Sequence, residues 1–414
     1  MGRRRAAAAD ASDRALGGAS TLFVAFLVVT MRASAQTAGG GSPTPLNDGD
    51  IEILGRRNDG LRVQSVMTRI TAFDQYGHGY QSQAGPVLGP GSERATILEP
   101  QLQVVATQGD RLTHVITVPI DVVTAASPNS ISPKSVDVLS GASRHVVSGT
   151  LDWGTTYRTD SASDLSMMSG LHLEEPFRSW HGGLGGSHSF AGGDTVVSAN
   201  VIEVFDWFDR FDIMGNRHGR AERSSTTASI GVTQIVTPTL LVGANYGLTL
   251  QQGELGNTWN SVPLTNLERG PEILPDGRVR HAFVARAAQF LPWNGALRLY
   301  YRFYVDDWGV VANSLEGQLL QRLSPLVYVS ALYRFHEQSG VDFFTTRGSP
   351  DLQWRTADSD LAMLRSQTVG GKIAVDAPIE GEVRVLHFEV GYEYYVRDNG
   401  LSMNIVTCAT GYHF

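Results

Sequence analysis

The chain has 414 residues, of which 42% are hydrophobic and 18% charged, and it contains a single Cys. One cysteine excludes a disulfide framework and a zinc site built from four thiolates. A formal net charge of −8 with scattered basic residues argues against a nucleic-acid-binding face. The hydrophobic share is too high for a disordered chain, and a mean hydropathy of −0.11 is too low for a bundle of membrane helices.

The first 35 residues resemble a secretory signal. Arg3, Arg4 and Arg5 form a basic leader, an apolar segment follows at 21–30, and Ala33-Ser34-Ala35 fits a small-residue cleavage site. A membrane anchor is the alternative, but this apolar segment is short of the roughly 20 residues needed to span a bilayer. We therefore expect residues 1–35 to be removed, 36–60 to be a disordered lead-in, and 61–414 to form the folded domain.

From Leu61 onward, apolar and polar side chains alternate in many segments, most clearly in 296–306 and again in 382–397. In 296–306 one face carries apolar and aromatic side chains, namely Leu297, Leu299, Tyr301, Phe303 and Val305. The other face carries charged and tyrosine side chains, namely Arg298, Tyr300, Arg302, Tyr304 and Asp306. Because successive side chains of a strand point to opposite sides, each segment predicts a strand with one apolar and one polar surface.

The alternation predicts an all-β chain of about sixteen antiparallel strands, with fourteen and eighteen as alternatives. The predicted strands are 61–73, 97–107, 112–123, 145–157, 163–173, 179–190, 195–205, 224–236, 240–251, 280–290, 296–306, 314–323, 326–336, 361–376, 382–397 and 401–414. A soluble β-sandwich would alternate in the same way, so the connections decide between the two architectures.

Every second connection is tight, and those between are mostly long. The tight ones are 108–110, 191–194, 237–239, 292–295, 324–325 and 377–381. The long ones are 74–95, 124–144, 206–223, 252–279 and 337–360. Short turns at one rim and long loops at the other are typical of an antiparallel transmembrane β-barrel of the outer membrane.

The last predicted strand also favours a barrel. Its alternate residues include Tyr412 and Phe414, and a terminal aromatic after an alternating strand is similar to the C-terminal assembly signal of bacterial outer-membrane proteins. Lipid offers no hydrogen-bond partners, so a membrane-spanning sheet must pair both of its edges. We expect a closed barrel in the outer membrane, with its ends and short turns on the periplasmic side and a water-filled lumen.

Three segments resemble motifs of a family of Gram-negative outer-membrane β-barrel proteins of unassigned function. They are 301–309 (Tyr-Arg-Phe-Tyr-Val-Asp-Asp-Trp-Gly), 333–344 (which begins Tyr-Arg-Phe-His) and 356–361 (Thr-Ala-Asp-Ser-Asp-Leu). The Ser-Gly-Ala-Ser at 140–143 is similar to a further element of that family, and His336 stands where the family usually has Tyr. The resemblance implies an outer-membrane barrel and assigns no reaction.

The candidate site is a polar cluster in the lumen near the outer rim. If both ends of the barrel are periplasmic, strands 296–306 and 326–336 run outward. They then bring together Arg302, Tyr304, Asp306, Asp307, Arg334 and His336. Charged rings in a lumen screen solutes by charge, so a constriction or binding patch is one interpretation. The other is an ion-paired wall that keeps the strands in register, since the lumen of such a barrel is polar in any case.

No pattern indicates an enzyme or a cofactor, and metal binding is not favoured. Asp206, Asp209 and Asp212 recur every third residue in an expected loop and offer oxygen ligands of the kind that calcium prefers. The aromatic residues between them fit a loop at the membrane interface better. The His residues lack an H-E-x-x-H spacing, and His181 and His188 fall on opposite faces by parity.

Three hypotheses for function follow. The favoured one is a pore or export channel for small solutes with a charged lumen. The second is a non-transporting barrel that anchors a partner in an envelope complex. The third and least favoured is a barrel-embedded lipid hydrolase, which needs a nucleophile and a His facing lipid on adjacent strands. The expected partners are outer-membrane lipid and the barrel-assembly machinery. A homo-oligomer and a periplasmic or surface protein partner stay open, and nucleic acid is not expected.

Overall fold

The computed structural model describes residues 60–77, 95–125, 146–174, 177–211, 217–256, 261–266, 269–379 and 384–414. The signal sequence expected at 1–35 lies outside these ranges, as does the lead-in expected at 36–60 except for Gly60. Within the ranges, no helix is long and apolar enough to span a membrane.

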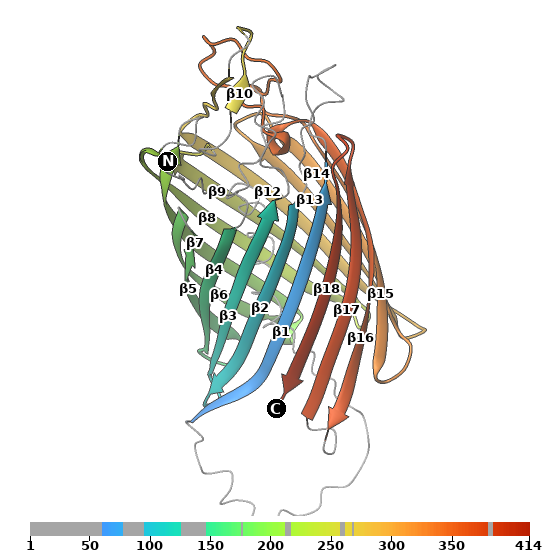
Figure 1. The fold of residues 1–414 in the computed structure, drawn as a ribbon. Coiled ribbons are helices and arrows are strands. Elements are labelled where there is room, and N and C mark those ends of the chain that lie inside the picture. The colour runs from blue at the N-terminus through green and yellow to red at the C-terminus, as the bar shows by residue number, and fades with distance from the viewer. Residues whose placement is uncertain are drawn as a thin grey trace, which may run out of the picture.

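Sixteen antiparallel strands close into one barrel (Figure 1). They are β1 (Leu61–Tyr76), β2 (Ala95–Gln108), β3 (Leu112–Ala125), β4 (Val146–Arg158), β5 (Ser163–Leu173), β6 (Phe177–Phe190), β7 (Thr195–Phe211), β8 (Arg217–Thr237), β9 (Leu240–Gly253), β12 (Gly277–Leu291), β13 (Gly295–Asp306), β14 (Val311–Arg322), β15 (Val327–Gln338), β16 (Leu364–Ile379), β17 (Arg384–Arg397) and β18 (Ser402–His413). Two short strands, β10 (Ser261–Pro263) and β11 (Arg269–Pro271), form a separate sheet.

The barrel closes between its first and last strands. Strand β1 pairs with β18 in continuous register, from Ser65 opposite His413 to Tyr76 opposite Ser402. A sheet closed in this way leaves no strand edge that would expose unpaired N–H and C=O groups to lipid. The predicted sixteen-strand antiparallel barrel is therefore confirmed.

One predicted connection is wrong. Residues 206–223 were expected to form a long loop, but β7 continues to Phe211 and β8 begins at Arg217. In this extension Asp206 pairs with Arg223 and Phe208 with Ala221. This part of the strands was not predicted because neither of its faces is consistently apolar. Backbone hydrogen bonds and cross-strand side-chain pairs stabilise it instead.

Short connections gather at the end of the barrel where β1 begins and β18 ends (Figure 1). Asn294 and Gly109 adopt positive φ values of 61° and 59° in two of these turns, a conformation common in tight hairpins. In the turn between β4 and β5, Asp160 accepts hydrogen bonds from the N–H groups of Ala162 and Ser163, both at 2.7 Å. The N–H of Ala162 contributes most to lowering the pKa of the Asp160 carboxyl below its ordinary value.

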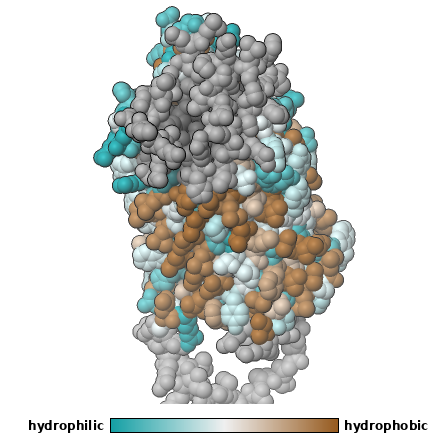
Figure 2. All heavy atoms as spheres, in the orientation of Figure 1, coloured by the Kyte–Doolittle hydropathy of each residue, from teal (hydrophilic) through white to brown (hydrophobic). Residues whose placement is uncertain are grey.

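The strand register sorts side chains between the two faces of the wall, because directly opposite residues share a face. Tyr301 lies opposite Ala285 and Leu315, and the exposed apolar residues of β12–β18 have mostly this parity, as the 54% exposed Leu315 illustrates. Figure 2 shows such hydrophobic side chains spread over the strands of the visible face. The other parity carries the polar residues, which line the lumen.

A folded layer of loops lies at the opposite end from the short turns (Figure 1). The connection from β9 to β12 contains β10 and β11, and it joins the connection from β15 to β16 through bridges such as Leu264 with Gly348 and Ile273 with Arg355. Val262 and Thr356 are fully buried between these loops. The long connections expected at 252–279 and 337–360 therefore exist, and they pack against each other.

Candidate functional site

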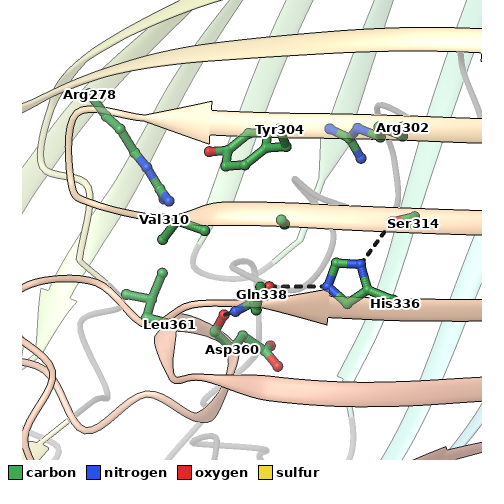
Figure 3. Close-up of a pocket in the computed structure, with 10 residues that line it drawn as sticks. Arg278, Arg302, Tyr304, Val310, Ser314, His336, Gln338, Asp360 and Leu361 are labelled. Carbon is green, nitrogen blue, oxygen red and sulfur yellow. Dashed lines mark hydrogen bonds between the residues drawn. The ribbon is translucent and has the colours of Figure 1, made fainter.

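The three motif segments meet around one pocket (Figure 3), in the mouth of the barrel at the end that carries the loop layer. Side chains from β12, β13, β14 and β15 line a pocket there, together with residues of the loop before β16. The lining residues are Arg278, Arg302, Tyr304, Val310, Ala312, Ser314, His336, Gln338, Asp360 and Leu361. Its cavity volume of about 60 Å³ fits a few water molecules or one charged group of a solute, and not a whole solute.

Asp306 is the centre of the hydrogen-bond network beside this pocket. Its carboxylate accepts hydrogen bonds from Arg278, from the Tyr304 hydroxyl at 2.6 Å, and from the N–H groups of Trp308 and Val310, both at 3.0 Å. The side chain of Asp306 is 0% exposed and that of Arg278 is 7% exposed. A buried carboxylate with this many donors is well compensated for its desolvation, and it fixes the turn between β13 and β14.

Trp308 is the centre of an apolar cluster beside the pocket. Its indole N–H donates to the Gly277 carbonyl at 2.9 Å, and the Arg278 guanidinium lies 4.3 Å from the centre of its ring. The Phe343 ring packs edge-on at 5.3 Å between centroids, and Val310 and Val341 complete a buried cluster. Strands β12 to β14 are thereby joined to the loop after β15.

His336 and Arg302 face the pocket from the strand wall. His336 Nδ1 lies 2.8 Å from Ser314 Oγ and its Nε2 lies 3.3 Å from Gln338 Oε1. The Gln338 amide donates to the carbonyls of Asp360 and Ala362 at 2.7 and 2.8 Å. Arg302 lies over the Tyr304 ring at 5.6 Å, and within the described residues it has no carboxylate partner.

The other two predicted site residues lie away from the pocket. Asp307 accepts a hydrogen bond from the Val279 N–H at 2.9 Å and so ties the turn to β12. Arg334 faces the lumen below the pocket and pairs with Glu316 on β14 at 2.7 Å. The structure thus groups Arg302, Tyr304 and His336 around one space.

Several residues of the mouth were not predicted as site residues. Arg278 lies at the start of β12, where parity alone places it inward beside Asp306. Gln338 follows the predicted end of its strand. Asp360 reaches the site from a loop and pairs with Arg397. The charge and inward parity of Arg278 could have predicted its place in the site. The position of Asp360 could not be predicted in this way, because a loop has no regular alternation of side chains.

The possible calcium ligands do not converge. Asp206 is buried on the inner face and pairs with Arg223, while Asp209 belongs to the outward parity and contacts Arg217 at 2.5 Å. Asp212 lies outside the described residues. His181 and His188 face opposite sides of β6, as parity predicted. His181 lies 2.8 Å from Asp152 and His188 lies 2.8 Å from Ser163.

Ser314 and His336 are a hydroxyl and an imidazole on adjacent strands, which is the contact that the hydrolase hypothesis required. Both side chains line the pocket of the lumen, so they do not face lipid. The second imidazole nitrogen meets the Gln338 amide in place of the carboxylate that usually orients a catalytic His. This pair therefore gives the lipid hydrolase no support, whereas Ser163 and His188, which lie 2.8 Å apart, do share the outward face of the adjacent strands β5 and β6.

Together, the closed antiparallel wall, the apolar outer face and the polar lumen define a transmembrane β-barrel of the outer-membrane type. The chain belongs to the family described as protein of unknown function (DUF3570), whose model matches residues 187–408, more than half of the chain. The matched region contains every residue that lines the mouth pocket.

No curated protein matches the sequence significantly. Among solved structures, the chain is similar to a BenF-like porin from Pseudomonas fluorescens Pf-5 at 9% identity and a TM-score of 0.43, over 85% of this chain and 99% of that one. A bacterial polysaccharide outer-membrane secretin aligns at 10% identity and 0.43, over 84% and 98%. OccK2 (OpdF) of Pseudomonas aeruginosa, in complex with glucuronate, aligns at 8% and 0.42, over 85% and 96%. We draw no functional argument from similarity this remote.

Proposed function

We propose that the barrel is a pore for small polar solutes across the outer membrane. The observation that carries the proposal is the polar inner face of a closed sixteen-strand wall. On β14 this face presents Ser314, Glu316 and Gln318, while the intervening outward positions include Leu315 and Leu319. Sixteen strands enclose a lumen too wide for such side chains to fill, so water and solutes can occupy it.

The same proposal includes the orientation and assembly of the barrel. The end with short turns faces the periplasm, and the loop layer with the mouth pocket faces outward. Residues 1–35 deliver the chain through the inner membrane. Tyr412 and Phe414, whose rings meet edge-on at 4.7 Å between centroids, form the signal for the barrel-assembly machinery.

Cysteine accessibility in planar lipid bilayers tests the pore. In a Cys408→Ser background, Gln318→Cys places a thiol on the inner face and Leu319→Cys places one at the next position, on the outer face. We expect stepwise conductance from both proteins. A charged methanethiosulfonate reagent should reduce the current through Gln318→Cys and leave Leu319→Cys unchanged. Absence of conductance at every voltage, or equal effects on both variants, would contradict the proposal.

A second candidate function is suggested by the loop layer, which exposes Ile273, Leu352 and Trp354. These side chains suit the docking of a surface protein, with the barrel as its anchor. A photo-crosslinking residue at position 354 should then capture one protein in stoichiometric amount from intact cells. The same residue in place of Trp293, which is exposed at the opposite rim, should not.

A further inference from the structure

We propose that the seam between β12 and β13 binds the anionic group of the solute, such as a carboxylate or phosphate. This inference deepens the proposed pore function and assigns a solute class to it. Four arginines carry it, Arg280, Arg286, Arg298 and Arg302, and we call them the arginine seam. All four have inward parity on the two neighbouring strands.

Two other arginines of the same wall show what a structural ion pair looks like in this barrel. Arg278 pairs with Asp306, and Arg334 pairs with Glu316. The described part of the chain places no carboxylate within salt-bridge distance of any arginine of the seam. Arg280 lies opposite Asp306, but the carboxylate of Asp306 forms its ion pair with Arg278. Among the described residues, Arg286 donates to the Thr233 hydroxyl, at 2.7 Å, and to no other side chain.

Unpaired charge is not needed to hold strands in register, because ladder hydrogen bonds already do this. Leaving guanidinium groups without counter-charges next to each other costs free energy through mutual repulsion. A wall that needed only polarity could use Gln or Thr, as β9 does with Thr249 opposite Arg280 and Gln251 opposite Arg278. The retained charge is therefore best explained by a ligand that supplies the missing anion.

The seam arginines stand at successive depths. Their depths can be compared along β13, which carries Arg302 and Arg298. Arg280 lies at the level of Asp306, before Arg302, and Arg286 lies at the level of Tyr300, between Arg302 and Arg298. Eight residues separate the first level from the last, which is about 27 Å along a strand and about 20 Å along the axis of a barrel whose strands tilt by about 40°. The apolar band of such barrels is about 25 Å tall. An anion can thus pass from one guanidinium to the next through most of the membrane.

Acidic side chains lie on the wall opposite the seam. In the ring of sixteen strands, β12 lies directly across from β2, and β13 lies across from β3. The inward positions of β2 to β4 include Glu99, Asp121 and Asp152. An anion in the lumen therefore meets guanidinium groups on one side and carboxylates on the other, of which Asp152 contacts His181.

The chemistry of the seam fits oxyanions. A guanidinium presents N–H groups in a planar fork that matches a carboxylate or phosphate. Tyr300 and Ser314 contribute hydroxyl groups on the same face, beside Arg286 and Arg302. Arg298 and Tyr300 are exposed, so their polar ends are accessible from the lumen.

Equilibrium binding to the purified barrel in detergent tests the inference without requiring conduction. The probes are ¹³C-labelled gluconate and sorbitol, which share a six-carbon chain and differ in one carboxylate, with NMR line broadening as the readout. We expect gluconate to bind and sorbitol not to bind. Added salt should weaken the binding of gluconate, because it screens the guanidinium charges.

Arg298→Gln with Arg302→Gln removes two seam charges and should weaken gluconate binding severalfold. Arg298→Gln alone, at a position without a partner, should weaken it less. The matched control is Arg220→Gln, the same change at an 83% exposed outward side chain, which should bind as the wild type does. Heat-dependent migration on gels confirms that each variant is folded.

Two outcomes overturn the inference: wild-type barrel that does not broaden gluconate, and a double variant that binds it as strongly as the wild type. Either result leaves the pore proposal intact if the methanethiosulfonate reagent still reduces the current through Gln318→Cys. Conversely, gluconate binding by a barrel that conducts no ions would support the arginine seam and refute the pore. The two proposals therefore fail separately.

Discussion

Asp306 accepts hydrogen bonds from a guanidinium, a phenol and two backbone amides, and this explains why two acidic residues in a row have different roles. Asp306 has the inward parity of β13 and holds the mouth together, whereas Asp307 lies past the strand end and binds the Val279 backbone. Neither carboxylate is free to bind a solute. The anion-binding groups of this wall are instead the arginines that lack such partners.

Asp306→Asn should destabilise the barrel strongly. The change leaves the Arg278 guanidinium buried without a counter-charge, and breaking a buried pair in this way costs about 3–5 kcal/mol. The measurement is urea unfolding in lipid vesicles followed by tryptophan fluorescence. Glu316→Gln is the control, because its partner Arg334 has a 46% exposed side chain and exposed pairs contribute at most about 1 kcal/mol. Similar losses in both variants would show that burial of the first pair is unimportant.

Parity in the sequence was enough to place Arg302, Tyr304 and His336 on the inner face of β13 and β15, which β14 separates. It was not enough to bring Arg278 and Asp360 to them. Those contacts depend on which strands are neighbours and on how a loop returns, and neither is encoded by a two-residue period.

At the scale of elements, the mouth with the pocket depends on one loop that Trp308 holds in place. The connection from β15 to β16 meets Trp308 through the Phe343 ring and through the Asp342 N–H, which donates to the Trp308 carbonyl at 2.9 Å. Further along the loop, Arg355 is buried and donates to the carbonyls of Pro271 and Pro350 at 3.2 and 2.9 Å. The loop is a packed element of the structure.

Trp308→Ala should release this loop while the strands stay paired. The variant loses the packing of a buried indole, which typically costs about 3–5 kcal/mol, and here the loss falls on the loop contacts. Trypsin should then cleave after Arg355, a site that is buried in the wild type, with the products identified by mass spectrometry. Trp293→Ala, at an exposed position of the opposite rim, should leave Arg355 protected. Equal protection in the two variants would mean that the loop is held by other contacts.

Most strands were predictable from the sequence, because a wall between lipid and water imposes strict alternation. The exceptions were the short strands β10 and β11, within an expected loop, and the part of β7 and β8 that lies beyond Phe205 and before Ser224. There both faces of the hairpin carry charges, as with Asp206 on one side and Asp209 on the other, so the alternation disappears although the strands continue. The alternation of apolar and polar residues reflects a difference between the environments on the two sides of a strand. Where the two environments become alike, the alternation disappears and no longer predicts the strand.

At the scale of the whole molecule, closure decides the architecture, and the sequence contains no local signal for it. Strands β1 and β18 are separated by almost the entire chain, and many registers between them would keep apolar residues outward. The observed register places Ile70 opposite Cys408. Both have the outward parity, and the thiol of Cys408 is free and exposed.

Ile70→Cys should therefore form a disulfide with the native Cys408 in the folded barrel. Directly opposite residues of an antiparallel pair have Cα atoms about 4.5–5.5 Å apart, within the range that a disulfide spans. Oxidation with a membrane-permeable catalyst should produce a faster-migrating band on denaturing gels without reductant, because the bond closes most of the chain into a loop. Ala72→Cys, on the same face but opposite Val406, should form no such bond. Crosslinking at position 72 in place of position 70 would indicate a register shifted by two residues, and crosslinking at neither position would count against closure between β1 and β18.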